Sequence, residues 1–458
     1  MQYSDSSLPF IVGKNPGHND DAMPTASTSS GTEPSESHSR LKVMYGAEDL
    51  LESALIAVDA YGIYVVDENG REYIDCVSGT FDQPLGHRHP AIIEALKQQA
   101  DELAYAGSPF VGKPVVELAE KLIEISPPNL DMVHLRDVTG STAIEGAIKI
   151  AQVATGKRDV ITFFGSHHGQ TALTTDISGN AFRREPYPSH FAGSLQVPAA
   201  NCYRCFYRQK FPECGLLCAV QIEQFIEHAS SGSVAAVIVE PIQGNGGNIV
   251  PPPGYFQQLR ELCDKHGMLL IVDEVQTGMG RLGTMLASEY FDIQPHMVVL
   301  AKGLGGPASR GAILLEQGLQ KMSRQQHSST AGSSLLSASA ALATIKVLEQ
   351  PGFLEGVRAR GANLGIGLGK LKQDFDVIGD VRGVGFMWGL EIVTSSGAPD
   401  PALCNRLIKD GLKFGLILKS SRYGYGNVVK VRPPLIMTES EMAEMLSRLQ
   451  KLFYSLTV

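Results

Sequence analysis

MLLIVDEVQTGMGRLG (268–283) and MVVLAKGLGG (297–306) are the most informative segments of this 458-residue chain. Each begins with a short apolar run that predicts a buried strand, and the two runs lead to Asp273 and Lys302. In α/β sheets, ligands bind at the carboxyl ends of the strands. A carboxylate and an amine in such a crevice suit one chemistry well. The amine can form a Schiff base with an aldehyde cofactor, while the carboxylate keeps a pyridine nitrogen protonated.

The flanking segments alternate between strand and helix patterns. VAAVIVE (234–240) and GAILLE (311–316) have the composition of buried strands, and TAIEGAIKIAQVA (142–154) has helical periodicity. Uninterrupted apolar strands between helices predict an α/β fold with a mostly parallel central sheet covered on both faces. From about 54 to 75 the alternation predicts a small antiparallel hairpin, and one long helical stretch is expected from about 333 to 373.

The composition excludes several classes of partner. With 43% hydrophobic and 19% charged residues, the chain can bury a large core. A net charge of −9 argues against binding to nucleic acid or to an anionic membrane surface, and no apolar run approaches the length of a membrane span. Seven cysteines, an odd number without a signal peptide, indicate reduced thiols in a cytoplasmic enzyme.

The first 40 residues differ in composition from the rest. Residues 1–40 are rich in Ser, Thr, Pro and acidic residues and have almost no apolar periodicity, which predicts a disordered tail. A mitochondrial transit peptide would be rich in Arg and poor in acids, whereas this segment carries more acidic than basic residues.

A family resemblance rests on several motifs. DEVQTGMGRLG followed by AKGLGG resembles the signature of the class III pyridoxal-phosphate (PLP) aminotransferases, a branch of the fold type I PLP enzymes. Segments from LGHRHPAIIEAL (85–96) to RPPLIMTESEM (432–442) match in the same order, so the resemblance covers roughly nine tenths of the chain. It implies a large PLP-binding domain over 96–332 and a smaller α+β domain built from 41–95 and 333–458.

The resemblance also implies roles at the cofactor ring. Lys302 would carry PLP and, once a substrate amine displaces it, act as the general base that moves a proton from Cα to C4′. Asp273 would pair with the pyridine nitrogen, and Gln276 would donate to the phenolic oxygen. Val275 and His167 would pack against opposite faces of the ring. An imidazole offers less surface than Tyr or Phe and titrates near neutral pH.

Three further positions concern the cofactor phosphate and its loops. In VTGSTAIEGAIKIA (138–151), Gly140 and Ser141 match the family's phosphate cup, although the residues alone are equally typical of a helix cap at Ser141 or Thr142. Thr330 matches a Thr that reaches the phosphate of the neighbouring subunit, which implies a homodimer with the active site at the interface. Glu240 is expected to support the cofactor loop.

The substrate carboxylate has two candidate partners in NVVKVRPPL (427–435). Lys430 occupies the position of the family's substrate-binding arginine, and Arg432 follows on the same face of the strand. Arg432 is favoured because only Arg gives a planar bidentate fork. A Lys here also resembles the branch that acts on amino-alcohol phosphates, and a solvated pair on an edge strand is the plain structural alternative. Asn245 stands where ornithine- and aminobutyrate-type enzymes have a switching Glu, which argues against their mechanism.

A cysteine-rich segment is open to two interpretations. Cys202, Cys205, Cys214 and Cys218 have the spacing C-x2-C-x8-C-x3-C, which resembles a structural zinc knot. The second gap is short for such a site, so reduced structural cysteines without a metal are the favoured interpretation.

Together these features predict a cytoplasmic, homodimeric, PLP-dependent class III aminotransferase that moves an amino group from a small amino acid or amine to a 2-oxo acid by a ping-pong mechanism. The alternative on the same scaffold is a PLP-dependent decarboxylase, racemase or phospho-lyase, because the substrate pocket, and not the cofactor motif, sets which bond breaks. A silent binding protein of this fold is disfavoured by the intact Lys302 and Asp273.

Overall fold

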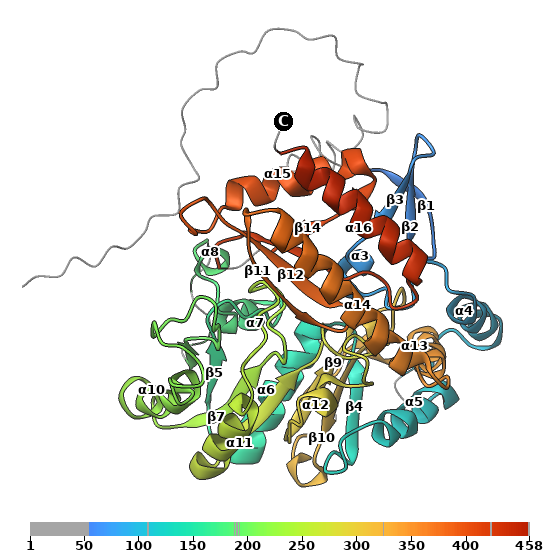
Figure 1. Cartoon of the computed structure of the whole chain (residues 1–458). Helices are drawn as coiled ribbons and strands as arrows, with labels where there is room; N and C mark the ends of the chain where they lie inside the picture. Colours follow the sequence, from blue (N-terminus) through green and yellow to red (C-terminus); the bar gives the residue numbers. More distant parts are fainter. Residues whose placement is uncertain are drawn as a thin grey trace, which may run out of the picture. The chain divides into compact units, whose positions relative to one another are not determined.

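A central sheet with the strand order β4–β10–β9–β8–β7–β5–β6 organises the computed structural model (Figure 1). The structure describes residues 55–456 apart from 108–109, 187, 189–190, 192, 324 and 422–423. The strands are Met132–Asp137 (β4), Asp159–Phe163 (β5), Ser194–Val197 (β6), Val234–Val239 (β7), Leu269–Asp273 (β8), Met297–Leu300 (β9) and Gly311–Leu315 (β10). The pairings from β9 to β6 are parallel, and β10 is antiparallel to both neighbours. The predicted mostly parallel α/β sheet is confirmed.

The apolar strands are buried because helices cover both faces of this sheet. Every residue of β7 and β8 is buried. From Ala236 to Val239 the side chains of β7 alternate between two hydrophobic clusters. Ala236 and Ile238 pack in the cluster that contains α6 (Gly140–Thr155), whereas Val237 packs in the one that contains α11 (Tyr255–His266).

Two smaller sheets accompany the central sheet, and the first of them joins N-terminal and C-terminal parts of the described chain. The first contains Ala57–Tyr61 (β1), Tyr64–Asp67 (β2), Glu72–Asp75 (β3) and Leu416–Ile417 (β13), and the second contains Ile378–Val384 (β11), Met387–Ile392 (β12), Val428–Val431 (β15) and Lys419–Ser420 (β14). Strands β1, β2 and β3 pair antiparallel, which confirms the predicted hairpin. Ile74 in β3 pairs with Leu416 in β13, so the two ends of the chain share one sheet.

The remaining helices surround these sheets. They are Ser78–Phe81 (α3), Pro90–Glu102 (α4), Lys113–Glu124 (α5), Ala172–Ile177 (α7), Ala181–Arg184 (α8), Leu217–Val220 (α9), Ile222–Ala229 (α10), Ala287–Tyr290 (α12), Leu335–Leu348 (α13), Phe353–Asp374 (α14), Pro401–Gly411 (α15) and Glu439–Tyr454 (α16). The helical stretch expected from about 333 to 373 consists of two helices, α13 and α14. Pro351 and Gly352 separate α13 from α14, and Gly352 adopts the left-handed backbone conformation with φ of 81°.

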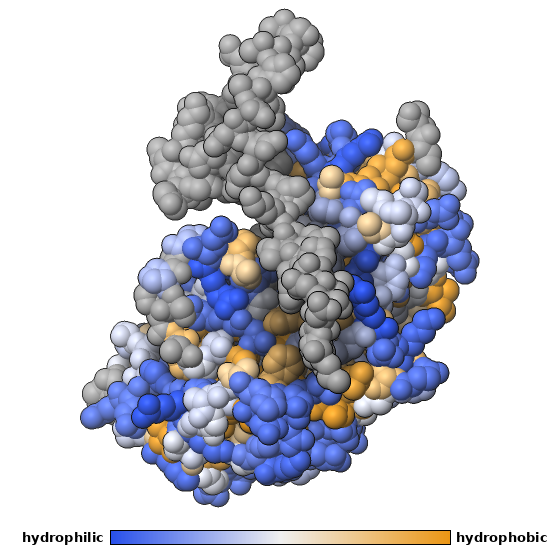
Figure 2. Space-filling model, turned by 90° about the vertical axis from the view of Figure 1, so that its left-hand side faces the viewer, coloured by the Kyte–Doolittle hydropathy of each residue, from blue (hydrophilic) through white to orange (hydrophobic). Residues whose placement is uncertain are grey.

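Polar residues cover most of the coloured surface in Figure 2, and hydrophobic residues form separate, smaller patches. Within the described residues, no helix combines the length and the hydropathy needed to cross a bilayer. The predicted disordered tail, residues 1–40, lies outside the described residues. The predicted domain boundaries stay predictions.

Candidate active site

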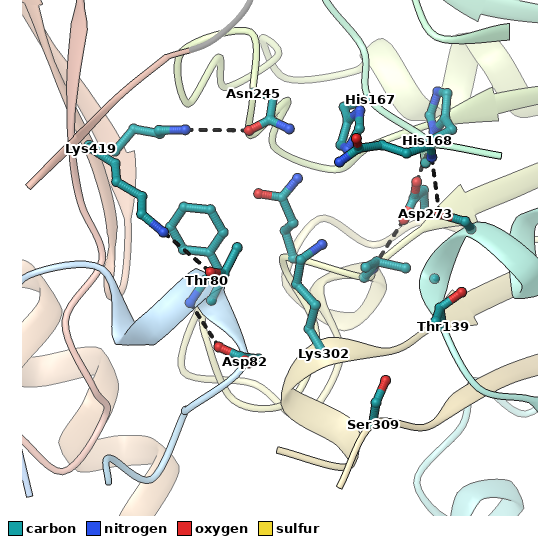
Figure 3. A pocket seen from close by; sticks show the side chains of 18 of the residues that line it. Thr80, Asp82, Thr139, His167, His168, Asn245, Asp273, Lys302, Ser309 and Lys419 are labelled. Atoms are coloured by element: carbon teal, nitrogen blue, oxygen red, sulfur yellow. Dashed lines mark hydrogen bonds and ion pairs between the residues drawn. The ribbon is translucent and has the colours of Figure 1, made fainter. Parts of the chain in front are cut away.

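A pocket of about 460 Å³ opens beyond the carboxyl ends of β8 and β9. Of the predicted site residues, those that line it are Gly140, Ser141, His167, Asp273, Val275, Gln276, Lys302 and Lys430. The predicted residues Glu240, Thr330 and Arg432 are not part of this lining. Figure 3 shows Lys302 between Lys419 on one side of the pocket and Asp273 on the other. The expected crevice at the strand ends is present, because both strands stop where the chain turns toward the ligand space.

Asp273 is held by a buried histidine that the sequence analysis did not single out. The carboxylate is 4% exposed, and its Oδ2 lies 2.8 Å from Nδ1 of His168. Its Oδ1 accepts a hydrogen bond of 3.1 Å from the backbone N–H of Val275. Both contacts orient the carboxylate at the end of the strand. The only sequence signal for this role was the adjacency of two histidines.

Lys302 begins the short 3-10 helix η2 (Lys302–Leu304) with a φ of 44°, in the left-handed region that residues other than glycine rarely adopt. Such strain is often kept at functional sites. Desolvation lowers the pKa of the Lys302 ammonium group, and the carboxylates of Asp273 and Glu240 oppose that shift. A lowered pKa raises the fraction of neutral amine, which is the form that attacks an aldehyde or accepts a proton.

Glu240 connects two loops beside the pocket. Its Oε1 accepts a hydrogen bond of 2.9 Å from the backbone N–H of His167, and its Oε2 accepts one of 2.8 Å from that of Gly244. Burial raises the pKa of the Glu240 carboxyl to about 7. Burial, together with the positive charge of Lys302, lowers the pKa of His167 to about 3. An imidazole with this pKa is neutral at pH 7.

The N-terminus of α6 lines the pocket with its first residues. Its cap is Thr139, whose Oγ1 accepts from the backbone N–H of Thr142 at 3.2 Å, and not Ser141 or Thr142 as the sequence suggested. The Ser141 hydroxyl instead accepts a hydrogen bond of 3.1 Å from the backbone N–H of Gln170. A Cβ at Gly140 would approach Val275 to 3.0 Å. A helix N-terminus with free N–H groups and a glycine at this place fits a phosphate group.

Lys430, which belongs to β15, and Arg432, which lies one residue beyond the end of that strand, have different surroundings. The Arg432 guanidinium is 1% exposed, and it donates to Gln276 Oε1 at 2.7 Å, to the Gly244 carbonyl at 2.8 Å and to Asn248 Oδ1. Burial lowers the pKa of Arg432 to about 9. Lys430, in contrast, lines the pocket. The geometry thus favours Lys430 over Arg432 for substrate contact, the reverse of the expected order.

The contact from Arg432 also fixes the amide of Gln276. Because the guanidinium has only donors, the atom it binds is the carbonyl oxygen of the amide, Oε1. The NH₂ group of Gln276 is therefore left as the donor for a ligand in the pocket, which Gln276 lines.

Thr330 lies at the start of the 3-10 helix η4 (Thr330–Ser333) and is exposed. Its loop is attached to β4, because the backbone N–H and the hydroxyl of Ser329 both donate to the Arg136 carbonyl, at 3.2 Å and 2.9 Å. The hydroxyl of Tyr105 donates to the Thr330 carbonyl at 3.2 Å.

The four clustered cysteines line a separate cavity of about 20 Å³. Burial raises the pKa of the Cys218 thiol to about 12, which favours the protonated form. All seven cysteines of the chain are free thiols. In the described part of the chain, no three His, Cys, Asp or Glu side chains are grouped so that they could hold a metal ion.

A sheet of this topology, with an acid and a lysine meeting at its strand ends beside a helix N-terminus, defines a PLP-dependent enzyme of fold type I. Residues 45–453 match the family model Aminotransferase class-III, and the chain belongs to that family and uses PLP. The residues present fit the cofactor, since the pocket offers an amine, a carboxylate at the strand end and a helix N-terminus whose free N–H groups can bind a phosphate.

Relatives with different activities match the chain to a similar degree. An acetylornithine aminotransferase of Methanopyrus kandleri is 34% identical over 86% of this chain and 92% of its own. An alanine/serine racemase of Pyrococcus horikoshii is 30% identical over 85% and 83%. Among solved structures, the omega transaminase from Pseudomonas jessenii in complex with PMP has a TM-score of 0.85, with 28% identity over 93% of this chain and 98% of that one.

Proposed function

We propose that this protein is an aminotransferase that moves an amino group from a small amino acid or amine to a 2-oxo acid by a ping-pong mechanism. The observation that carries the proposal is the meeting of Lys302 and Asp273 in one pocket at the ends of β8 and β9. Relatives of this chain with such activities include a 5-aminovalerate aminotransferase of Pseudomonas putida, 33% identical, and a solved taurine:2-oxoglutarate aminotransferase, 26% identical.

The bound cofactor supplies an aldehyde and a ring that accepts electrons. Lys302 would hold that aldehyde covalently, and after release its neutral amine would take the proton from the substrate Cα. Asp273, kept in place by His168, would hold the proton on the ring nitrogen. The free N–H groups at Gly140 and Ser141 would bind the phosphate.

Other residues in and beside the pocket would position the ring. Gln276 would donate from its NH₂ group to the phenolic oxygen, because Arg432 binds its carbonyl oxygen. The neutral imidazole of His167 and the side chain of Val275 would pack against the ring faces. Glu240 would keep the His167 loop in place through its hydrogen bond to the backbone.

The anionic group of the substrate would bind at Lys430, because this residue lines the pocket and Arg432 does not. Arg432 would act as a positioning residue for Gln276. Lys430 therefore replaces Arg432 as the preferred residue for substrate contact, and the segment around β15 stays the proposed site of substrate recognition.

A homodimer with the active site at the subunit interface is supported by one surface. Large hydrophobic side chains are exposed along residues 103–116, namely Leu103, Tyr105, Phe110, Val111 and Val116. Tyr105 in this segment also binds the loop of Thr330, so the apolar surface and Thr330 lie together. A second copy covering this surface would bring Thr330 toward its partner's cofactor.

The seven free thiols support a cytoplasmic location.

Racemisation is the second candidate, because two racemases are 30% and 33% identical to this chain over most of its length. Both reactions begin when a base removes the Cα proton, and they differ in the atom or face that receives the proton afterwards.

A screen of amino donors against pyruvate and 2-oxoglutarate tests the proposal. Appearance of the new amino acid, dependent on both substrates and without release of carbon dioxide or phosphate, is the expected result. Loss of enantiomeric purity of a single amino acid with no acceptor present would favour racemisation. Release of carbon dioxide or phosphate would favour the decarboxylase or phospho-lyase alternative.

A further inference from the structure

Asp137, the last residue of β4, lies buried between two histidines. It is 1% exposed. Its Oδ1 lies 3.0 Å from Nε2 of His327, and its Oδ2 lies 3.3 Å from Nδ1 of His134. Although burial raises the pKa of the Asp137 carboxyl, the contacts with His134 and His327 lower it to about 2. Asp137 is therefore an anion at pH 7, and a buried anion is costly without such partners.

The ring of His327 lies between β4 and α6. Its Nδ1 is 3.3 Å from Nζ of Lys149, a residue of α6. Because the ammonium group of Lys149 has only donors, Nδ1 accepts this bond, and Nε2 carries the proton that is donated to Asp137. A Cβ at Gly146 of α6 would approach His327 Nε2 to 2.7 Å, so the ring packs directly on the helix backbone. His327, with a side chain that is 10% exposed, is thus held by both the sheet and the helix.

The Thr330 segment, from His327 to Ser333, is attached to β4 on both sides of Thr330. On one side, His327 contacts the end of the strand, and Ser329 donates twice to the Arg136 carbonyl. On the other side, the Arg136 guanidinium donates to Ser333 Oγ at 2.8 Å. Thr330 between them is exposed. The position of this exposed residue therefore depends on the contacts that hold the two ends of its segment.

The same carboxylate lies next to the part of the pocket that suits the cofactor phosphate. Two residues after Asp137, Thr139 caps α6 and lines the pocket (Figure 3). Asp137 therefore connects two elements: the turn that begins α6, which it precedes in the chain, and the Thr330 segment, which it holds through His327. In the proposed homodimer both elements contact a phosphate, the first in its own subunit and the second in the partner subunit.

We propose that His327 is a positioning residue for cofactor binding across the subunit interface: its bond to Asp137 holds the Thr330 segment where Thr330 reaches the phosphate of the cofactor in the partner subunit. The inference rests on the proposed homodimer and adds to it a residue that does not line the pocket. A segment that is already held in place loses less conformational freedom when Thr330 binds the phosphate. Without the bond, the phosphate contact weakens while the contacts to the cofactor ring stay.

The test measures the dissociation constants of PLP and of pyridoxal, which lacks the phosphate, on the full chain by the absorbance of the bound aldehyde. His327→Ala should weaken PLP binding by about tenfold to a hundredfold, since the most that it can remove is one hydrogen bond to a charged group. Its affinity for pyridoxal should stay that of the wild type. His327→Gln, whose amide N–H can still donate to Asp137, should restore most of the PLP affinity.

A double-mutant cycle shows whether His327 acts through Thr330. Thr330→Val removes the hydroxyl and should weaken PLP binding by a similar factor. In the Thr330→Val background, His327→Ala should have no further effect on PLP binding, because the contact that it positions is already absent. His228→Ala is the matched control, since this histidine has a side chain that is 67% exposed and lies 3.8 Å from Glu227. If His327→Ala does not fold, Asp137→Asn removes the charge from the same contact and should lower the preference for PLP over pyridoxal.

The outcomes separate this inference from the proposed function. Equal losses of PLP and pyridoxal affinity in His327→Ala would overturn the positioning role, because a general loss of structure affects both ligands. Effects of His327→Ala and Thr330→Val that multiply in the double variant would also overturn it, since the two residues would then act separately. In both cases the aminotransferase proposal stands. An unchanged PLP affinity in Thr330→Val, or a holoenzyme that sediments as a monomer, would instead count against the proposed interface, and the role of His327 would fall with it.

Discussion

Replacing Arg432 by Met tests whether this arginine positions Gln276 or binds substrate. The buried guanidinium satisfies three acceptors, on Gln276, Gly244 and Asn248, and its Cζ lies 4.0 Å from the centre of the Phe81 ring. A buried acceptor that loses its donor costs about 1–3 kcal/mol, so the three together set an upper limit of about 9 kcal/mol. Removal of the buried positive charge offsets part of this free-energy cost, because the folded state no longer has to desolvate the guanidinium. We expect the free energy of unfolding to fall by about 3 kcal/mol.

The assay is thermal unfolding of the holoenzyme at one heating rate, followed by kinetics with charged and uncharged amines. At about 2 °C per kcal/mol for a large domain, Arg432→Met should lower Tm by about 6 °C. Because Gln276 loses its orientation, kcat should fall for all amines to a similar extent. Arg406→Met is the matched control, since Arg406 is 59% exposed, pairs with Asp410 at 3.4 Å and should change Tm little.

An Arg432→Met enzyme with an unchanged Tm and a raised KM for carboxylate substrates alone would contradict the positioning role of Arg432. That pattern would show that the guanidinium reaches the substrate, as the sequence first suggested.

Three further predictions concern single carboxyl and amine groups. Lys302→Ala should abolish turnover and covalent cofactor attachment while the far-ultraviolet circular dichroism stays that of the wild type; residual turnover would exclude Lys302 as the essential base. Asp273→Asn should slow removal of the Cα proton by about two to three powers of ten but weaken PLP binding much less, because only a charge is lost; single-turnover rates near those of the wild type would contradict this. The pKa of Glu240 is about 7 in the folded chain and 4.5 in its ordinary state. Between these two pH values the folded state keeps a proton that the unfolded state loses. The free energy of unfolding should therefore fall by about 3 kcal/mol as the pH rises from about 4.5 to 7. Glu240→Gln should flatten that dependence in urea unfolding at pH 5 and 7, and parallel curves for the two proteins would contradict the assignment.

The sequence predicted those parts of the site that depend on local motifs. Asp273 and Lys302 each come at or just after the end of an apolar strand. Parallel strands have their carboxyl ends at one edge of the sheet, so the two residues lie close together regardless of how the helices pack. The central sheet and the N-terminal hairpin follow from the same periodicities. The break between α13 and α14 was missed because the helical pattern continues on both sides of Pro351 and Gly352.

The less predictable parts depend on contacts between distant segments. The sequence places Lys430 and Arg432 two residues apart, as on one face of a strand. Only the folded positions of Gly244 and Asn248 show that the Arg432 guanidinium turns into the protein. Lys419 and Lys430 are opposite each other in the register of two short strands, β14 and β15. The sequence could not predict this position, because a two-residue strand has almost no periodic pattern.

The central claim is that Lys302 holds the cofactor, and the most direct measurement is borohydride reduction of the holoenzyme followed by peptide mapping. We expect a pyridoxyl group on Lys302, within the peptide that contains LAKGLGG (300–306). A label on any other lysine, including Lys419 or Lys430 in the same pocket, would contradict it.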